Sequence, residues 1–363
     1  MRLDTALHDR TPPQIKEIDR LAAARTGDES AFAALTLPFQ RELHVHCYRM
    51  LGSLDDADDA LQETLLRAWR QLDRFEPRAP FRAWLYRIAT NVCLTMLATR
   101  TRRGEISSTT LAHDRDAGSR QEGEPVHLDP YPDRLLDELT VSPLGPEATV
   151  EQAESVELAF VAAVQLLPPR QRAALLLRHV IGYTTAEVAA MLETSVAGIN
   201  STLQRARATL EQERTAAQVA RRHYRTSTAT ESALVRRLVD AWHATDVPVI
   251  VDLLTEDALL AMPPQPEHYV GRMAIGAFLA TVPGDGRLDR FRLVPTRANR
   301  QPAVAEYYRD GDDGAFHAHG VMILSIEGDA IASLTHFAGP ALVGRFGLPM
   351  TLDDRATVHS KSR

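Results

Sequence analysis

The spacing of the hydrophobic residues changes near residue 230, and this change limits what the chain can fold into. Over residues 14–100 and 151–214, apolar residues recur at the three- and four-residue intervals of amphipathic helices. After about residue 231, two short helical segments are followed by strand-like segments separated by Gly and Asp turns: RFRLVPTRA, PAVAEYYR, HAHGVMILSIEG and AIASLTHFAG. The sequence therefore predicts a multidomain protein in which two all-α domains precede an α+β domain.

The composition excludes several classes of protein. A length of 363 residues suits two or three domains, and 44% hydrophobic residues are enough for real cores. No run of roughly 18 apolar residues and no apolar leader occur, so we expect neither a membrane span nor a secretory signal. Cys47 and Cys93 are the only cysteines, which argues against a disulfide scaffold and indicates a reducing, cytoplasmic compartment.

An acidic linker is predicted between the two helical blocks. Residues 101–150 are rich in Gly, Ser, Asp, Glu and Pro, and carry 5 basic and 10 acidic side chains. Such a length without periodicity favours a flexible, functional tether. Its one less polar patch is HLDPYPDRLLDEL, at residues 127–139.

A helix-turn-helix pattern lies at residues 183–210. Thr184 and Glu187 form a capping box, and Ser195 is a suitable N-cap for the following helix, which is expected to bury Val196, Ile199, Leu203, Ala206 and Leu210. The opposite face presents Ala197, Ser201, Gln204, Arg205 and Ala208, flanked by Asn200 and Arg207. Amide and guanidinium groups can read base edges in a major groove, which favours DNA binding. The alternative is an ordinary α-hairpin with a solvated face.

Two further helices are predicted around the loop RFEPRAP at residues 74–80, whose prolines end one helix and open the next. The first is expected to bury an apolar stripe and to expose a charged face. The stripe comprises Leu61, Leu65, Ala68, Trp69 and Leu72. The second, at roughly 80–98, is expected to bury Leu85, Ile88, Val92 and Met96.

These blocks resemble parts of a known family. Residues 49–97, RMLGSLDDADDALQETLLRAWRQLDRFEPRAPFRAWLYRIATNVCLTML, are similar to region 2 of bacterial extracytoplasmic-function (ECF) sigma factors, and residues 166–210 resemble their region 4. The resemblance implies binding to core RNA polymerase, through its β′ clamp helices and β flap, and to promoter DNA. It also implies that the chain is not an enzyme and needs no cofactor, because nucleotidyl transfer belongs to the polymerase.

The resemblance assigns residues to three interfaces. The residues expected to bind core polymerase are Asp58, Asp59, Gln62, Glu63 and Arg67. The residues expected to bind the melted −10 strand are Arg82, Trp84, Arg87 and Asn91. The residues expected to bind the −35 duplex are Ala197, Asn200, Ser201, Gln204, Arg205 and Arg207. A solvated charged face is the alternative for the first set, and core packing is the alternative for Trp84. Asn200 and Thr202 stand where many ECF factors carry arginine, so a different −35 preference is expected.

Residues 231–350 resemble a SnoaL-like, NTF2-type cone, and ECF factors with a fused SnoaL-like domain are a known architecture. The linker patch DPYPDRLLD is similar to a segment that recurs in that subgroup. The domain boundaries expected are therefore 14–100 for region 2, 101–150 for the linker, 151–214 for region 4 and 231–350 for the SnoaL-like domain. The domain is expected to modulate the sigma factor in cis, because a tethered domain acts at an effective concentration on the order of millimolar.

A cone of this type encloses a pocket. The polar residues expected to line it are Trp242, His243, His268, Tyr307, His317, His319 and His336. His317 and His319 alternate on one predicted strand, so both are placed on the side of the cavity. Histidine suits acid–base chemistry near neutral pH, yet it is also a common structural residue. Catalysis, sensing of an unknown small ligand and a purely protein-contacting regulatory role all remain open.

The rival interpretation of the whole chain is a SnoaL-type enzyme, an isomerase or a hydrolase, fused to a DNA-binding front end. No glycine-rich phosphate loop and no G-x-S-x-G motif are present, so NTPase and hydrolase motifs give it no support. A zinc site at His44, His46 and Cys47 lacks structural-zinc spacing. No metal site is expected.

Overall fold

The computed structural model describes residues 12–76, 80–103, 128–137, 156–217, 228–265, 267–310 and 314–353. The chain forms two compact units, which we describe separately. The first contains residues 1–108, 138–143 and 168–203, and the second contains residues 109–137, 144–167 and 204–363. Most of the predicted linker, and residues 77–79 of the predicted loop, lie outside the described residues. Within the described part, no helix has the length and hydropathy required to cross a membrane.

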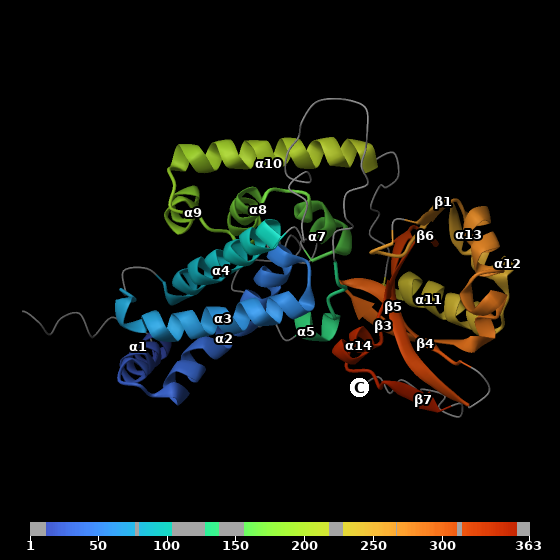
Figure 1. Cartoon of the computed structure of the whole chain (residues 1–363), viewed down its shortest axis with the longest axis horizontal. Helices are drawn as coiled ribbons and strands as arrows, with labels where there is room; N and C mark the ends of the chain where they lie inside the picture. Colours follow the sequence, from blue (N-terminus) through green and yellow to red (C-terminus); the bar gives the residue numbers. More distant parts are fainter. Residues whose placement is uncertain are drawn as a thin grey trace, which may run out of the picture. The chain divides into compact units, whose positions relative to one another are not determined.

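The N-terminal part of the first unit is all helical, as predicted (Figure 1). Its helices are α1 (Pro12–Arg25), α2 (Glu29–Leu51), α3 (Leu54–Gln71) and α4 (Phe81–Arg103). Asp28 caps α2 by accepting hydrogen bonds from the amides of Ser30 and Ala31, and α2 ends at Gly52, whose φ of 82° favours glycine. Ser53 then caps α3. Asp55 and Asp56 lie in the first turn of α3, where carboxylates favour the N-terminal end of a helix.

The buried face of α3 differs in part from the predicted stripe. Its fully buried row consists of small residues, Ala57, Ala60, Thr64 and Ala68, whereas Leu61, Leu65 and Trp69 are only partly buried. Small side chains let the backbones of α2 and α4 approach α3 closely. The larger residues sit on the flanks of this row; Trp69 lies edge-on to Phe32, with ring centroids 5.1 Å apart.

The remainder of the first unit carries the predicted helix-turn-helix. Its elements are α8 (Pro169–Leu175), a π-helical turn (Leu176–Val180), α9 (Thr185–Met191) and the start of α10 (Val196–Ala217). The capping box of Thr184 and Glu187 is present. On α10, Ile199, Leu203 and Ala206 are buried as predicted, but Val196, in the first turn, is 46% exposed and Leu210 is only partly buried.

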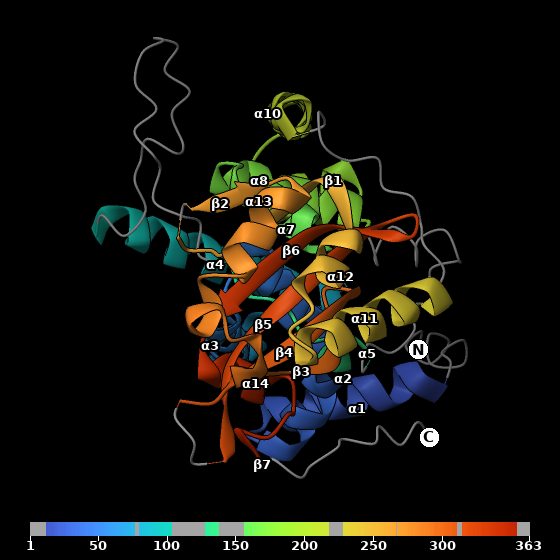
Figure 2. The same cartoon turned by 90° about the vertical axis from the view of Figure 1, so that its right-hand side faces the viewer.

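The second unit is built on one mixed sheet with helices on both faces (Figure 2). Its strands are β1 (Leu254–Ala261), β2 (His268–Val270), β3 (Phe291–Ala298), β4 (Gln301–Tyr308), β5 (Ala315–Glu327), β6 (Ala330–Ala338) and β7 (Thr351–Asp353). The order is β2-β1-β6-β5-β4-β3, with β7 paired to β5. Only β1 and β6 are parallel among these pairs; the others are antiparallel.

Two cores lie on opposite faces of this sheet. On one face, Leu238 and Trp242 of α11 (Thr228–His243) and Ile275 of α13 (Arg272–Leu279) pack with Leu293, Val304 and Met322 of the strands. This core also takes in α12 (Val247–Asp252). On the other face, Val343 of α14 (Pro340–Arg345) packs with the alternate strand residues. The α+β prediction is confirmed.

Two short helices of the second unit come from the predicted linker and from the first residues of the second predicted helical block. They are α5 (Asp133–Asp137), within the less polar patch of the predicted linker, and α7 (Leu158–Gln165). The linker patch has no helical periodicity that would predict α5, which is only 5 residues long. Its Leu136 is 1% exposed and Tyr131 just before it is 0% exposed, so this patch is buried against the sheet domain.

Candidate functional site

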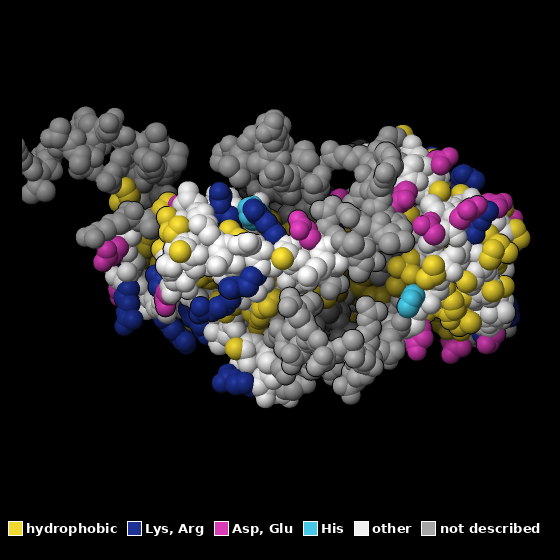
Figure 3. All heavy atoms as spheres, turned by 90° about the horizontal axis from the view of Figure 1, so that it is seen from above, with side chains coloured by type: hydrophobic (Ala, Val, Ile, Leu, Met, Phe, Trp, Pro, Cys, Tyr) yellow, Lys and Arg dark blue, Asp and Glu magenta, His cyan; other side chains and the backbone are white. Residues whose placement is uncertain are grey.

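The outer face of α10 carries the residues predicted to contact the −35 duplex. Ala197, Asn200, Ser201, Gln204, Arg205 and Arg207 are all exposed. The turn before α10 is fixed by Ser195, whose hydroxyl accepts a hydrogen bond from the Gly198 amide at 3.0 Å. Figure 3 views the chain from above, and Arg side chains are visible over its helical part. A rigid helix therefore presents amide, hydroxyl and guanidinium groups in one row.

Both arginines predicted to hold −10 DNA are engaged within the first unit. Arg82 makes a forked contact with Glu42, with nitrogen–oxygen distances of 2.7–3.0 Å, and its guanidinium lies 4.8 Å above the Tyr86 ring. It also approaches the hydroxyl of Tyr183, at 3.5 Å. Burial lowers the pKa of Arg82, but Glu42, Tyr86 and Tyr183 together raise it more, so the net shift is upward. Arg87 lies 2.8 Å from Glu193, next to the helix-turn-helix turn.

Trp84 and Asn91 lie on the same helix with different surroundings. Trp84 is partly buried and packs against Phe75 and Phe81, with ring centroids 5.1 and 5.5 Å away. The packing role considered for Trp84 is therefore present. Asn91 is partly exposed two turns further along α4. Three of the four residues thus share the first turns of the helix, and Asn91 follows them.

The predicted polymerase-binding residues lie on α3. Asp59 and Gln62 are exposed, and Glu63 pairs with Arg67 one turn later at 2.6 Å. Asp58 differs from them because its carboxylate lies 3.0 Å from Nε2 of the buried His44. Asp58 therefore contributes to the packing of α2 on α3 as well as to the outer face.

The His44, His46 and Cys47 cluster has structural partners rather than a metal-site geometry. His44 pairs with Asp58, and Nε2 of His46 lies 2.9 Å from the Thr90 hydroxyl. Burial lowers the pKa of His46 to about 3, with Arg49 and Arg82 adding to the shift. Cys47 contacts Cys93 on α4. These side chains join α2 to α3 and α4.

The β3–β4 turn holds the linker patch in the second unit. The amide of Tyr131 donates to Oδ1 of Asn299, and Nδ2 of Asn299 donates to the carbonyl of Val156, just before α7. Asp133 accepts hydrogen bonds from the amide of Arg300 at 2.7 Å and from Arg297 at 3.3 Å. Asn299 and Arg300 have φ of 55° and 61°, a left-handed turn that Asn tolerates well. Sequence reasoning did not single out Asn299.

The first core of the second unit contains a cavity of about 170 Å³. Its walls are mostly apolar and include Leu260, Phe278, Phe291 and Met322. Of the polar residues predicted to line it, Trp242, His319 and His336 do so. Glu306, which sequence reasoning missed, lies among them although it is only 5% exposed. A carboxylate inside the apolar strand PAVAEYYR is the signal that could have revealed it.

The other predicted lining residues lie elsewhere. His243 accepts a hydrogen bond from the Leu293 amide at 3.1 Å, and His268 is exposed on the edge strand β2. Tyr307 is buried on the opposite face of the sheet, where its hydroxyl donates to the Pro349 carbonyl. His317 is exposed near the start of β5. Of the two alternating histidines, His319 therefore lines the cavity and His317 does not.

A β-bulge places His319 in the cavity. The pairing of β4 with β5 passes from Glu306↔Gly320 to Tyr307↔Ala318, which leaves His319 as the extra residue. Because of this bulge, His319 shares a face with Met322, whereas Ala318 and Val321 belong to the other core. Gly320 is required here, since a Cβ would lie 2.4 Å from the Phe337 carbonyl oxygen and 2.8 Å from His336.

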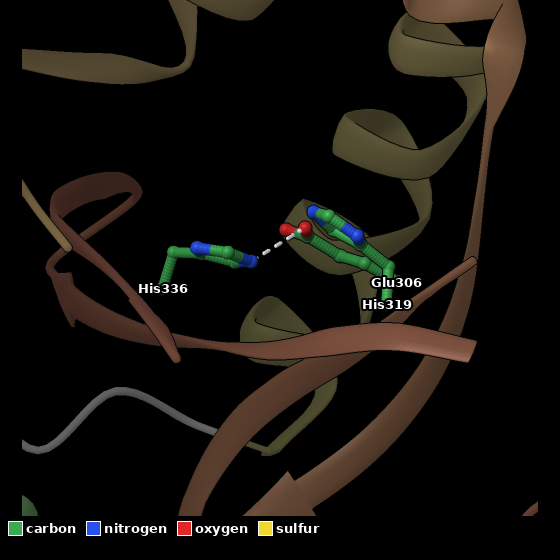
Figure 4. A group of neighbouring side chains, drawn as sticks. All are labelled: Glu306, His319 and His336. Carbon is green, nitrogen blue, oxygen red and sulfur yellow. Dashed lines mark ion pairs between the residues drawn. The ribbon is translucent and has the colours of Figure 1, made fainter. Parts of the chain in front are cut away.

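Glu306, His319 and His336 form one polar group at the cavity (Figure 4). Oε2 of Glu306 lies 3.0 Å from Nε2 of His336, and the two imidazole rings are stacked with centroids 5.7 Å apart. Burial lowers the pKa of His336, but Glu306 outweighs it and raises the pKa above the ordinary value. Burial lowers the pKa of His319 despite Glu306. The raised pKa favours the protonated form of His336, whereas the lowered pKa favours the neutral form of His319.

Comparisons with known proteins match each part. The models of sigma-70 region 2, sigma-70 region 4 and the SnoaL-like domain match residues 36–103, 157–210 and 235–334. The ECF RNA polymerase sigma factor SigG of Mycobacterium tuberculosis is 41% identical over 338 residues, 91% of this chain and 86% of SigG. SigW of Bacillus subtilis is 26% identical over 194 residues, 53% of this chain and 94% of SigW. The crystal structure of M. tuberculosis SigJ shares the fold, with a TM-score of 0.53 at 23% identity, covering 85% of this chain and 97% of SigJ.

Proposed function

Because the chain belongs to the ECF sigma factors of the sigma-70 family, we propose that it reads −10 and −35 promoter elements through two separate DNA contacts and that its SnoaL-like domain modulates initiation in cis. Family membership makes it a transcription initiation factor rather than an isomerase or hydrolase. The proposals concern which residues read DNA, which bind polymerase and how the third domain acts.

The exposed row on α10 is the observation that carries the proposed −35 contact. Gln204 and Asn200 have amides that pair with adenine edges, and Arg205 and Arg207 reach guanine or phosphate. Ala197 and Ser201 are small, so the helix can approach the groove closely. Ile199 and Ala206 hold the opposite side of the helix against the protein, being 1% and 0% exposed. A helix held in this way can dock in a major groove without rearranging.

The proposed −10 contact requires a change within the first unit. Arg82 is held by Glu42 of α2 and approaches Tyr183, while Arg87 contacts Glu193. Tyr183 and Glu193 belong to the region proposed to read the −35 element. These two arginines cannot hold phosphates while they hold those partners. We therefore assign the compact first unit to a resting form. The Arg87–Glu193 pair is 47% and 71% exposed, and such pairs contribute only about 0–1 kcal/mol, so its loss is no large barrier.

The polymerase contact is proposed for the outer face of α3, where Asp59, Gln62, Glu63 and Arg67 are accessible in part or in full. Asp58 is assigned to the same face, with the added role of pairing His44. Acidic groups predominate among these residues, with Asp58, Asp59 and Glu63 against Arg67, which suits a partner surface that carries basic groups.

The proposed regulation in cis is supported by the contacts of Asn299. The chain between regions 2 and 4 meets the SnoaL-like domain at Tyr131 and Asp133, and the first residues of region 4 meet it at Val156 and Leu158. A movement of this chain segment is therefore expected to be transmitted to the sheet domain through these hydrogen bonds. Removal of that domain frees both attachment points and changes the range of separations open to regions 2 and 4. A ligand shifts this balance only if it binds the attached and detached forms with different affinity.

Run-off transcription with purified core polymerase over a genomic promoter library tests the proposed promoter reading. Full-length protein is expected to direct initiation at a defined set of promoters. Asn91→Ala is expected to impair duplex templates more than templates pre-melted at −10, and to relax base preference there. Equal use of both templates with unchanged base preference would show that Asn91 does not read the −10 strand.

A further inference from the structure

We propose that Glu306, His319 and His336 form a binding site for one divalent first-row transition-metal ion of the Zn²⁺ or Fe²⁺ type. One donor atom from each residue lies within 4.8 Å of the other two (Figure 4). The site is separate from the DNA and polymerase contacts, so the proposed function does not depend on it.

The three residues come from adjacent strands whose register places them together. Glu306 is on β4, His319 is at the bulge of β5, and His336 is on β6, where it pairs with Met322 of β5. Ligands at about 2.0–2.2 Å from a common ion lie about 3–4 Å apart, so the donors need only a small inward movement. Rotation of the long side chain of Glu306 can provide this movement. Gly320 keeps β5 close to β6 and to His336. The backbone is therefore already arranged for the site.

The donor set selects the kind of metal. Two imidazoles and one carboxylate are the protein ligands of many zinc sites and of non-haem ferrous sites, whereas Ca²⁺ and Mg²⁺ prefer oxygen ligands throughout. Three protein ligands leave coordination positions open. The cavity of about 170 Å³ supplies space for a water molecule or a small exogenous ligand at those positions.

Two buried nitrogens support the inference. Nε2 of His336 is only 3.0 Å from Glu306 but is not aligned for a hydrogen bond with any described group. Nε1 of Trp242, a residue 4% exposed that lines the same cavity, also has no hydrogen-bond partner within the described residues. Buried polar groups are ordinarily hydrogen-bonded. A metal ion would engage the first nitrogen, and a ligand bound to the metal could accept from the second.

The competing explanation is a structural ion pair between Glu306 and His336, with His319 only packed beside it. The two explanations differ in what they require of His319. An ion pair does not need its imidazole, whereas the metal site loses a ligand without it. Ligand loss should weaken binding at least as much as the 10–100-fold typical of losing an outer-shell partner.

The test uses the full-length chain after chelator treatment and dialysis, titrated with Zn²⁺ in competition with a chromogenic chelator. The chain has 13 histidines, so His317→Ala, an exposed residue on the same strand, is the matched control. Wild type and His317→Ala are expected to bind one ion with equal affinity. His319→Ala and Glu306→Gln are expected to bind it at least tenfold more weakly. Thermal unfolding without metal checks that each variant remains folded.

X-ray absorption of the Zn²⁺-loaded wild type gives a result that needs no variant. Two imidazole ligands and a shell of oxygen ligands are expected. Equal Zn²⁺ affinity in wild type and in folded His319→Ala would overturn the proposal, and so would a spectrum without two imidazoles.

Discussion

Asn299 and Tyr131 exchange two hydrogen bonds of 2.8 Å across 168 residues of sequence. The Tyr131 amide donates to the Asn299 side-chain carbonyl, and the Asn299 amide donates to the Tyr131 carbonyl. Both residues are 0% exposed. In the proposed mechanism this pair is the attachment through which the SnoaL-like domain acts on the chain between regions 2 and 4.

Asn299→Gly is expected to loosen this attachment while the turn is kept, because glycine adopts the left-handed φ of 55° without strain. The substitution removes the partners of the Tyr131 amide and the Val156 carbonyl, which corresponds to about 1–3 kcal/mol per buried group left unpaired. Amide hydrogen exchange at Tyr131 should become faster. Asp329→Ala, at the exposed β5–β6 turn, is the control and should leave that exchange rate unchanged.

Reversal of charge on α3 tests the polymerase contact. Asp59→Lys with Glu63→Lys is expected to abolish binding to core polymerase without unfolding the domain, because both side chains lie on its outer face. Asp58 is left intact, since it pairs with the buried His44. Affinity for the β′ clamp helices can be measured by fluorescence anisotropy, with Asp240→Lys on the exposed side of α11 as the charge control. Undiminished affinity of the double variant would remove α3 from the interface.

Gln204→Ala and Arg205→Ala test the reading of the −35 element. Each is expected to weaken duplex binding by about 1–3 kcal/mol per lost base contact, or to relax the preference at one base pair. Exposed Glu211 lies further along the same helix, so Glu211→Ala serves as a control. Competition binding with every single base substitution in the −35 element gives the readout, and a uniform loss over all sequences would assign the residue to phosphate instead.

The lowered pKa of His46 predicts how the free energy of unfolding depends on pH. Its pKa is about 3 in the folded chain and about 6.5 when unfolded, so between these values only the unfolded state binds the proton. Folding stability contributed by His46 therefore falls as the pH drops below about 6.5, by roughly 1.4 kcal/mol per pH unit. Urea unfolding between pH 7 and pH 5 should show a shallower pH dependence for His46→Gln than for wild type. The exposed His268→Gln is the control, and equal pH dependence of all three proteins would contradict this role.

The helical domains could be predicted because their signals are local. The capping box of Thr184 and Glu187 is a contact three residues apart, and the buried row of Ile199, Leu203 and Ala206 follows from helical spacing. The strands β3 to β6 were similarly visible as strand-like runs between turns. Family resemblance then assigned roles that spacing alone left open.

The cavity could not be predicted in full because its geometry depends on pairing between strands. Counting alternate residues along β5 correctly places His317 and His319 on one face, opposite Phe316 and Ala318, but His317 is exposed near the start of the strand and only His319 lines the cavity. The bulge after Ala318 then puts Met322 on the same face as His319, which alternation alone does not predict. The pairing of β4 with β5 also places Glu306 beside the cavity. Asn299 is likewise defined by a contact with a residue 168 positions away, for which a single sequence carries no periodic signal.

Run-off transcription by the full-length chain and by a chain ending at residue 226 tests the central claim most directly. Both are expected to bind core polymerase equally, and both to initiate at the same promoters, but with markedly different output. Asn299→Gly should shift output in the same direction as the truncation. Identical output from full-length and truncated protein, at every promoter and across growth conditions, would contradict regulation in cis.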